Sequence, residues 1–326
     1  MPINQRDPDA GTATTVISET DVADAAARIA GKVRRVAVAP VDESTFPDAS
    51  VWLAYEFMQH TGSFKARGAA NLAAAHQAAD SMPEAGVVIA SGGNAGLACA
   101  WAAQATGTAA TVFLPATAPK VKIDRLRSYG ADVRLVGAQY ADALQASIGF
   151  SESTGALLSH AYDNPLIAAG AGTCAMEIRD QLPGLDTIVV AVGGGGLFSG
   201  TAAAMVPHRV RVVAVEPKNC RALNAALAAG GPVDVEVDSV AADTLGARRA
   251  SAMAYELATD PLVSSILVSD ASIIEARRAL WEHRRVVVEQ GGATALAALL
   301  SGAYEPQSGE RVAVVLCGAN TDPHDL

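Results

Sequence analysis

The sequence predicts an α/β protein built on parallel sheets, and three observations lead to that fold class. From about residue 86 onward, short apolar segments alternate with helical segments in the pattern strand, loop, helix. The strands are apolar along their whole length, which is typical of strands covered on both faces. Half of the residues are hydrophobic, 5% are aromatic and 29 are glycine, a composition that suits close packing of helices on sheets. With 326 residues, the chain can form two domains.

The first half of the chain begins with a polar segment and continues into alternating elements. Residues 1–17 show no regular pattern, and Ser18-Glu19-Thr20-Asp21 then supplies the chemistry of a helix start. Strands are expected at Val36–Val41, Val51–Phe57, Val87–Ala90, Thr111–Leu114 and Asp132–Val136. Helices are expected at Thr61–Ala79, Gly93–Ala105, Val121–Tyr129 and Tyr140–Gly149.

The second half repeats the same pattern after a stretch without periodicity. That stretch, Ala161–Ala171, is expected to be irregular. Helices are expected at Thr173–Gln181, Phe198–Met205, Ala222–Ala229, Ala250–Ala258, Ser272–Glu282 and Ala293–Ser301, and strands at Thr187–Val192, Val210–Val215 and Arg311–Leu316. The chain stops just after the last strand, so we expect no C-terminal regulatory domain.

Composition excludes several classes of function. A net charge of −10 argues against general nucleic-acid binding, which needs a basic face. No segment approaches about 18 uninterrupted apolar residues, and the N-terminus lacks the apolar core of a signal peptide, so we expect no membrane partner. The four cysteines, Cys99, Cys174, Cys220 and Cys317, form no CxxC pair, which argues against structural zinc. We therefore expect a cytoplasmic protein with reduced thiols.

A run of four glycines is the most interpretable motif. Gly193 to Gly196 follow an apolar strand and precede a helix, so their backbone N–H groups can converge on an anion at the helix N-terminus. Ser199 stands where a dinucleotide fingerprint would need its third glycine, and no Lys-Ser/Thr pair follows as in a Walker A loop. A single phosphate monoester therefore fits better than a dinucleotide or a triphosphate, and a plain tight turn remains the alternative.

Three further segments could carry chemistry. Ser91-Gly92-Gly93-Asn94-Ala95-Gly96 also follows a strand and opens a helix, where a carboxylate could bind, although a plain N-cap by Ser91 or Asn94 explains it equally well. Cys317-Gly318-Ala319-Asn320 ends the last strand, where open α/β sheets bind ligands. Lys65 lies among small residues and Phe64 near a helix start, and by itself it would be unremarkable there.

Together these segments resemble the fold type II pyridoxal-phosphate enzymes, and among them the threonine/serine dehydratase group. The resemblance runs from about residue 40 to 320, and its markers stand in the family's order: Glu56–Ala69 with Lys65, Ser91–Gly96, Ala118–Lys122 with Arg127–Ala131, Asp163–Pro165 with Ala169–Thr173, Gly193–Gly196 and Cys317–Asn320. It implies a tryptophan synthase β-like fold of two open parallel-sheet α/β domains with the cofactor between them. Residues 1–76 and 164–326 would form the large cofactor-binding domain, and residues 77–163 the small substrate-loop domain.

The resemblance assigns a role to each marker. Lys65 would form a Schiff base with pyridoxal 5'-phosphate and remove the Cα proton of the substrate, which requires its pKa to fall several units from about 10.4. Phe64 would pack on the cofactor ring, and Asn94 would hydrogen-bond the ring oxygen. The phosphate would be held by Gly193, Gly194, Gly195 and Gly196 with Leu197, and the substrate carboxylate by Ser91, Gly92, Gly93, Asn94 and Ala95. Thr244-Leu245-Gly246 and Glu289 would lie near the ring.

Three positions refine the expected activity. Cys317 would face the pyridine nitrogen as a neutral thiol, a weaker electron sink than an aspartate partner provides, which favours rapid loss of a β-leaving group. Gly92 stands where racemase relatives carry a serine that acts as a second base, so racemisation is disfavoured. Glu216 and the carbonyl of Cys220 match the family's cation site, but Ala222 replaces an aspartate, so we expect a monovalent cation or none.

The expected function is elimination of water from a β-hydroxy amino acid, L-threonine or L-serine, to give a 2-oxo acid and ammonia. The alternatives are a lyase acting on hydroxyaspartate, phenylserine or diaminopropionate, a serine/threonine racemase, and a non-catalytic protein that binds pyridoxal phosphate. Arg67, Arg127, Tyr140, Arg248 and Arg249 could favour an acidic substrate, although each is better explained as a surface or structural residue. Relatives are often dimers, so we expect a homodimer.

Overall fold

The computed structural model describes residues 16–325, and its elements lie close to those expected. The strands are β1 (Val38–Pro40), β2 (Ser50–Ala54), β3 (Val87–Ala90), β4 (Ala110–Leu114), β5 (Asp132–Leu135), β6 (Leu157–Leu158), β7 (Thr187–Ala191), β8 (Arg211–Pro217), β9 (Val263–Val268) and β10 (Arg311–Val315). The helices are α1 (Glu19–Ile29), α2 (Lys65–Ala78), α3 (Asn94–Thr106), α4 (Lys120–Ser128), α5 (Tyr140–Thr154), α6 (Pro165–Gln181), α7 (Gly196–Met205), α8 (Ala222–Ala229), α9 (Ala242–Leu245), α10 (Ala252–Ala258), α11 (Asp270–Arg284) and α12 (Gln290–Leu300). Short 3₁₀ turns occupy Glu43–Thr45, Glu56–Met58, His60–Gly62, Val206–His208 and Pro323–Asp325.

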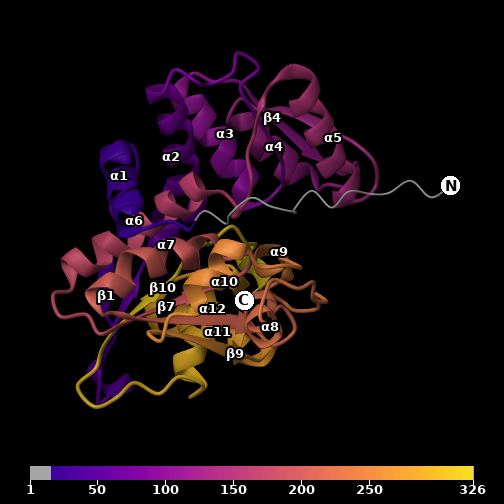
Figure 1. The fold of residues 1–326 in the computed structure, drawn as a ribbon. Coiled ribbons are helices and arrows are strands. Elements are labelled where there is room, and N and C mark those ends of the chain that lie inside the picture. The colour runs from indigo at the N-terminus through magenta and orange to yellow at the C-terminus, as the bar shows by residue number, and fades with distance from the viewer. Residues whose placement is uncertain (1–15, 326) are drawn as a thin grey trace.

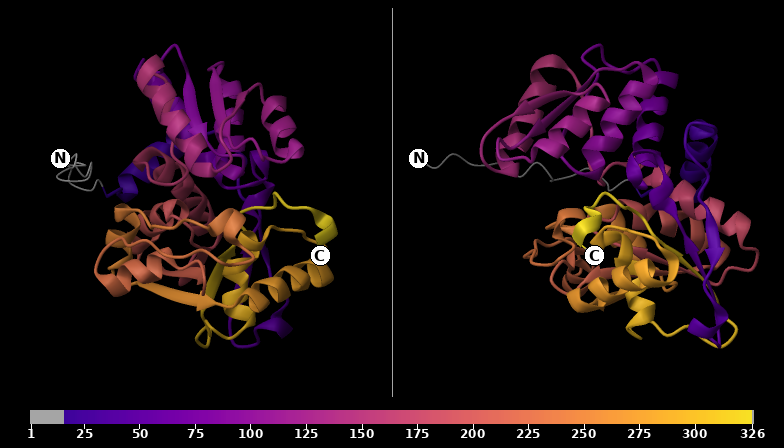
Figure 2. Two further views of the ribbon diagram at one scale, coloured as in Figure 1. Left: turned by 90° about the vertical axis from the view of Figure 1, so that its right-hand side faces the viewer. Right: turned by 180° about the vertical axis from the view of Figure 1, so that it is seen from behind.

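The strands form two separate sheets, as the parallel α/β pattern predicts. A six-stranded sheet has the order β1-β2-β10-β7-β8-β9, and a four-stranded sheet has the order β5-β4-β3-β6. Every pairing is parallel except that of β1 with β2. We call the four-stranded sheet with α3, α4 and α5 the small lobe, and the six-stranded sheet with its covering helices the large lobe. Figure 1 shows the two lobes one above the other, and both views of Figure 2 keep them distinct.

Each lobe has its own apolar core. In the large lobe, the inner strands β7, β8 and β10 are buried almost throughout, in keeping with the Val, Ile and Ala residues that make up most of each strand. Helices α6, α7 and α12 pack against this core through alanine-rich faces. In the small lobe, β3 and β4 are fully buried between α3, α4 and α5. The four-stranded sheet lies within residues 77–163, although the exact domain boundaries remain a prediction.

The structure corrects one expectation and extends others. Ala161–Ala171 is not irregular throughout, because α6 already begins at Pro165, where Asn164 caps the helix by accepting hydrogen bonds from Leu166 and Ile167 N–H. Strands β6 and β9 and the short helix α9 were not expected. The helix expected from Thr61 begins at Lys65, after a separate 3₁₀ turn at His60–Gly62.

Other expectations hold or fall outside the structure. Of the segment expected to lack regular structure, residues 1–15 lie outside the described residues. Ser18 and Asp21 form the expected capping box at the start of α1. Within residues 16–325, no helix is both long enough and apolar enough to cross a membrane.

Candidate active site

Lys65 is the first residue of α2 and directly follows a tight turn. Thr61 and Gly62 both have positive φ values, 63° and 77°. A side chain on Gly62 would collide with the amide of Asn320, 2.7 Å from the position of a Cβ, so glycine is required there on two grounds. The turn is fastened to the end of β10, since Phe64 N–H donates to the Cys317 carbonyl at 2.9 Å. Lys65 and Cys317 are therefore neighbours, as expected.

The environment of Lys65 favours its neutral form. Burial lowers the pKa of Lys65 to about 8, and the nearby Cys317 and Glu289 only partly oppose that shift. The Nζ atom donates to the Ala161 carbonyl at 2.6 Å and lies 4.9 Å from the centre of the Phe64 ring. A lysine with such a pKa exists partly as the free amine near neutral pH, which a nucleophile or a proton acceptor requires.

Cys317 lies two residues beyond the end of β10. Its thiol is 3% exposed, and Sγ donates a weak hydrogen bond to the Gly291 carbonyl at 3.7 Å. Burial raises the pKa of Cys317 to about 12, with the Glu289 carboxylate acting in the same direction, so the thiol is neutral near pH 7. This neutral thiol is the state that the sequence predicts.

Asn94 joins the small lobe to the large lobe through a polar network. Its Nδ2 donates to Glu289 Oε1 at 2.8 Å, and its Oδ1 accepts from Asn320 Nδ2 at 2.6 Å. Asn320 N–H also donates to Glu289 Oε2 at 3.2 Å, and its Nδ2 donates to the Thr61 carbonyl at 2.7 Å. Burial raises the pKa of Glu289 to about 7, although the Asn94 and Asn320 donors oppose the shift. The network fixes the orientation of the Asn94 amide beside the lysine segment.

The neighbouring residues of the Asn94 loop remain candidates for substrate binding. Asn94 is the first residue of α3, and Ser91, Gly92, Gly93 and Ala95 surround this helix start, where N–H groups face outward from the first turn. The Ser91 hydroxyl accepts the Gly93 N–H at 3.4 Å, so it already serves the loop. Their role in holding a carboxylate stays a prediction.

The glycine run forms a loop between β7 and α7. Gly195 has φ of +105°, which a residue with a side chain rarely adopts, and α7 begins at Gly196, followed by Leu197. The first N–H groups of a helix lack partners within it and are free to bind an anion. Close packing also requires the glycines: a Cβ on Gly193 would approach Leu245 Cα at 3.1 Å, and one on Gly194 would overlap the Tyr162 ring. Thr244–Gly246 thus borders this loop.

The expected cation ligands lie apart from this centre. Glu216, at the end of β8, is completely buried and accepts the N–H groups of Leu223 and Asn224, both at 2.8 Å, in the first turn of α8. Cys220 is buried in the loop between these elements. Residues 16–325 contain no group of three or more His, Cys, Asp or Glu side chains placed to hold a metal ion. A cation at Glu216 and Cys220 stays a prediction.

The residues considered for an acidic substrate have other roles or positions. Arg67 is fully buried and ion-paired with Glu56 and Glu177. The other four, Arg127, Tyr140, Arg248 and Arg249, lie exposed on the surface. These positions match the expectation that each of the five is a surface or structural residue.

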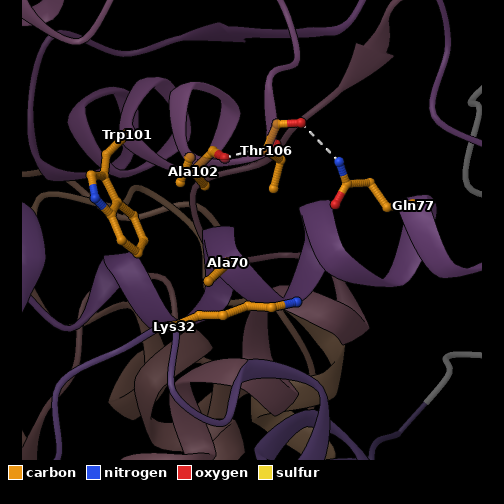
Figure 3. A pocket seen from close by; sticks show the side chains of 7 residues that line it. Lys32, Ala70, Gln77, Trp101, Ala102 and Thr106 are labelled. Atoms are coloured by element: carbon orange, nitrogen blue, oxygen red, sulfur yellow. Dashed lines mark hydrogen bonds between the residues drawn. The ribbon is translucent and has the colours of Figure 1, made fainter.

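A separate groove of about 400 Å³ is lined by residues of α2 and α3 together with Lys32. Figure 3 shows Lys32, Trp101 and Ala70 around it, with Gln77 donating to the Thr106 carbonyl at 2.9 Å. The groove is lined by Lys32, Ala70, Gln77, Trp101, Ala102, Ala105 and Thr106, and none of the predicted site residues is among them. It is therefore distinct from the centre around Lys65.

Sequence reasoning missed three residues of the centre. Asn320 orients Asn94, Tyr162 packs on the glycine loop, and His160 holds the turn that contains Tyr162. Asn320 and Tyr162 contact residues far away in the sequence, whereas His160 accepts hydrogen bonds within its own turn. Only the strand-end position of Asn320 gave a signal that could have identified it.

Comparisons with known proteins agree with this arrangement. The sequence profile described as "Pyridoxal-phosphate dependent enzyme" matches residues 33–318. The L-threonine ammonia-lyase of Thermotoga maritima is 34% identical over 310 residues, covering 94% of this chain and 76% of that protein. The L-threonine ammonia-lyase of Geobacter sulfurreducens is 36% identical over 275 residues, covering 83% and 67%.

Solved structures agree in fold over nearly the whole chain. Maize serine racemase has a TM-score of 0.88 at 30% identity, covering 95% of this chain and 96% of its own. A threonine deaminase from T.th. has a TM-score of 0.84 at 31% identity, covering 94% of this chain and 99% of its own.

Proposed function

The chain belongs to the family of pyridoxal-phosphate dependent enzymes, and from that premise we propose that it eliminates water from a β-hydroxy amino acid, L-threonine or L-serine. The products are a 2-oxo acid and ammonia. The threonine ammonia-lyase and deaminase relatives, each at least 31% identical, support this reaction.

The residues of the site fit the cofactor. Pyridoxal phosphate supplies an aldehyde that binds amines and a ring that withdraws electrons from the substrate Cα. Lys65 has the lowered pKa that covalent attachment to an aldehyde requires, and Gly193–Gly196 offer N–H groups for the phosphate. Ser63 Oγ, two residues before Lys65, is buried and has no hydrogen-bond partner within residues 16–325, so it is available to a bound group.

The proposal of elimination rests on which side chains can accept a proton from the substrate Cα and which can return one. Lys65 is the base with a suitably lowered pKa, and it acts by taking the proton from the substrate Cα. Gly92, on the opposite side in the racemase pattern, has no side chain to return a proton, and the nearby Ser91 hydroxyl is bonded to Gly93. A proton removed at one face is then not replaced from the other. The chain therefore favours loss of the β-hydroxyl over inversion.

Racemisation is the second candidate, because maize serine racemase matches the fold with a TM-score of 0.88. The residue at position 92 distinguishes elimination from racemisation, because the racemase pattern has a serine there. A Cβ at this position would lie 3.0 Å from Cδ2 of the buried Leu114, which would have to shift by a few tenths of an ångström, and 3.8 Å from Lys122 Cδ, and no main-chain atom is among its three nearest neighbours.

The remaining features of the proposal come from the sequence. It predicts a homodimer in the cytoplasm. A monovalent cation at Glu216 would have to compete with the two N–H groups that this carboxylate already accepts. The β-substituent remains open among threonine, serine, hydroxyaspartate, phenylserine and diaminopropionate, since one methyl group changes selectivity by only about 10–200-fold.

The proposal is tested with purified protein saturated with pyridoxal phosphate. Release of 2-oxo acid from these five amino acids is followed with a coupled dehydrogenase, and D-serine formation by chiral chromatography. Lys65→Ala should lower oxo-acid release by about 10²–10⁴-fold. Lys32→Ala, at an exposed lysine just after α1 and outside every family marker, is the matched control and should have no effect. A protein that binds the cofactor but releases no oxo acid from any of the five would refute the proposal.

A further inference from the structure

A turn at residues 160–163 carries the chain from the small lobe to α6. The N–H groups of Tyr162 and Asp163 both donate to Nδ1 of His160, at 3.3 and 2.8 Å. A ring nitrogen that accepts hydrogen bonds carries no proton, so the imidazole is neutral in this arrangement and its proton is on Nε2. The imidazole also contacts the Tyr162 ring edge-on, with 4.8 Å between the ring centres. One side chain therefore organises the whole turn.

The same turn touches both ends of the active site. The Ala161 carbonyl accepts the hydrogen bond from Lys65 Nζ. The Tyr162 ring lies on Gly194, where a Cβ would overlap it, and Tyr162 Cα and Cβ are 3.1 Å from the position of a Cβ on Gly196. The Tyr162 hydroxyl donates to the Arg249 carbonyl at 3.3 Å, which holds the ring across the loop. The lysine and the glycine loop are thus linked through three consecutive residues.

We propose that His160 is a positioning residue, whose neutral imidazole holds Ala161 against Lys65 and Tyr162 against the glycine loop in the geometry that binds the cofactor. Protonation of Nδ1 would remove the acceptor of both N–H groups and release the turn. This inference deepens the proposed function and rests on the cofactor that the family requires.

The charges around His160 come from both sides of the turn. Desolvation is the main cause that lowers the pKa of His160, the Asp163 carboxylate opposes it, and the Lys65 ammonium adds to it. Tyr140 and Asp234 face the neighbouring Tyr162. Because the folded pKa lies below that of a free histidine, the neutral form that the turn needs dominates at neutral pH and is lost on acidification.

The experiment compares two replacements of His160. Asparagine offers a side-chain oxygen that accepts N–H groups two and three residues later, as in an Asx-turn, and does not titrate. Phenylalanine keeps a ring but offers no acceptor. Affinity of the cofactor-free protein for pyridoxal phosphate is measured by absorbance and fluorescence titration at a series of pH values from near 8 down to about 4.5, roughly two units below an ordinary histidine pKa, because the pKa of His160 is lowered. His76→Asn, at a half-buried histidine near the end of α2 whose Nδ1 hydrogen-bonds the Ser81 hydroxyl, is the matched control.

His160→Phe should bind the cofactor about tenfold more weakly than wild type near pH 8, the loss expected for about one net hydrogen bond. His160→Asn should bind as tightly as wild type near pH 8, and acidification should weaken its binding less than that of wild type or His76→Asn. Thermal unfolding of the cofactor-free variants identifies any that are unfolded. The inference is overturned if His160→Asn and wild type lose affinity equally on acidification, or if folded His160→Phe binds like wild type. Failure of the proposed function is separate: wild type would bind the cofactor and release no oxo acid.

Discussion

Replacing Arg67 by methionine should reduce the free energy of unfolding by about 3–5 kcal/mol, because it leaves a buried carboxylate without its cation. Arg67 is fully buried, two residues beyond Lys65, and its Nε and NH2 atoms donate to the Glu56 carboxylate at 2.7 and 3.0 Å. Glu56 is itself only 1% exposed. Two hydrogen bonds to a charged group are together worth about 3–6 kcal/mol, which agrees with the value for breaking a buried pair.

The pH dependence gives a second measure of the same effect. Desolvation already raises the pKa of Glu56, and Arg67 is the main group that opposes the shift. Without Arg67, that pKa should rise further above its value in the unfolded chain. A raised carboxyl pKa means that the folded state binds a proton which the unfolded state has released, so stability falls as pH rises. The difference in the free energy of unfolding between wild type and Arg67→Met should therefore become smaller as the pH is lowered toward about 5.

Urea unfolding measures the loss, followed by circular dichroism and tryptophan fluorescence so that a single transition can be verified. Arg249→Met is the control. The Arg249 and Asp234 side chains form an ion pair at 2.8 Å, but they are 55% and 62% exposed. Loss of this exposed pair should therefore cost at most about 1 kcal/mol. Adding Glu56→Gln to Arg67→Met should recover part of the loss by removing the buried charge. If Arg67→Met destabilises no more than Arg249→Met, the buried pair does not have the assigned role.

Three further predictions follow from single residues. Gly92→Ser should introduce D-serine formation from L-serine while oxo-acid release persists, and a chiral assay that finds no D-serine would contradict the assigned role of Gly92. The rate of cofactor uptake by the cofactor-free protein should rise with pH and level off above about pH 8, because burial lowers the pKa of Lys65 to about 8. Stopped-flow rates that continue to rise up to pH 10.5, the ordinary pKa of a lysine, would disprove this. Because that folded pKa is lowered, stability of the cofactor-free protein should also increase between these two pH values. Glu216→Ala should destabilise the fold by about 1–3 kcal/mol in urea through two lost backbone hydrogen bonds, and Glu216→Gln, which keeps an acceptor, by less.

The fold could be predicted largely because its buried strands are continuous apolar runs bounded by loops. The exceptions have physical causes. Residues 165–172 contain three alanines and two glycines, and glycine suggests a break in a helix. In the structure, Gly172 packs against the main chain of Gly200, so these glycines permit close contact between α6 and α7. Strand β9 contains Ser264 and Ser265 at the sheet edge, which weakens the apolar signal.

The site could be predicted where a short segment carries its own signal. The lysine turn, the glycine run and the strand end at Cys317 are such segments, and the structure brings Lys65 and Cys317 together through the Phe64 hydrogen bond. Two of the residues missed, Asn320 and Tyr162, are defined by contacts with distant parts of the chain. Asn320 reaches back to Asn94 across 226 positions, and no local pattern announces that contact.

The contact between Asn94 and Glu289 links the packing of the lobes to the geometry of the site. Asn94 starts α3 in the small lobe, whereas Glu289 and Asn320 belong to the large lobe. The bonds that orient the Asn94 amide are therefore also bonds that hold the lobes together. A movement that separates the sheets must break them, and the same movement would withdraw the Asn94 loop from Lys65. The same hydrogen bonds therefore orient the Asn94 amide and connect the two lobes, and they meet at the Glu289 carboxylate, whose pKa burial raises to about 7.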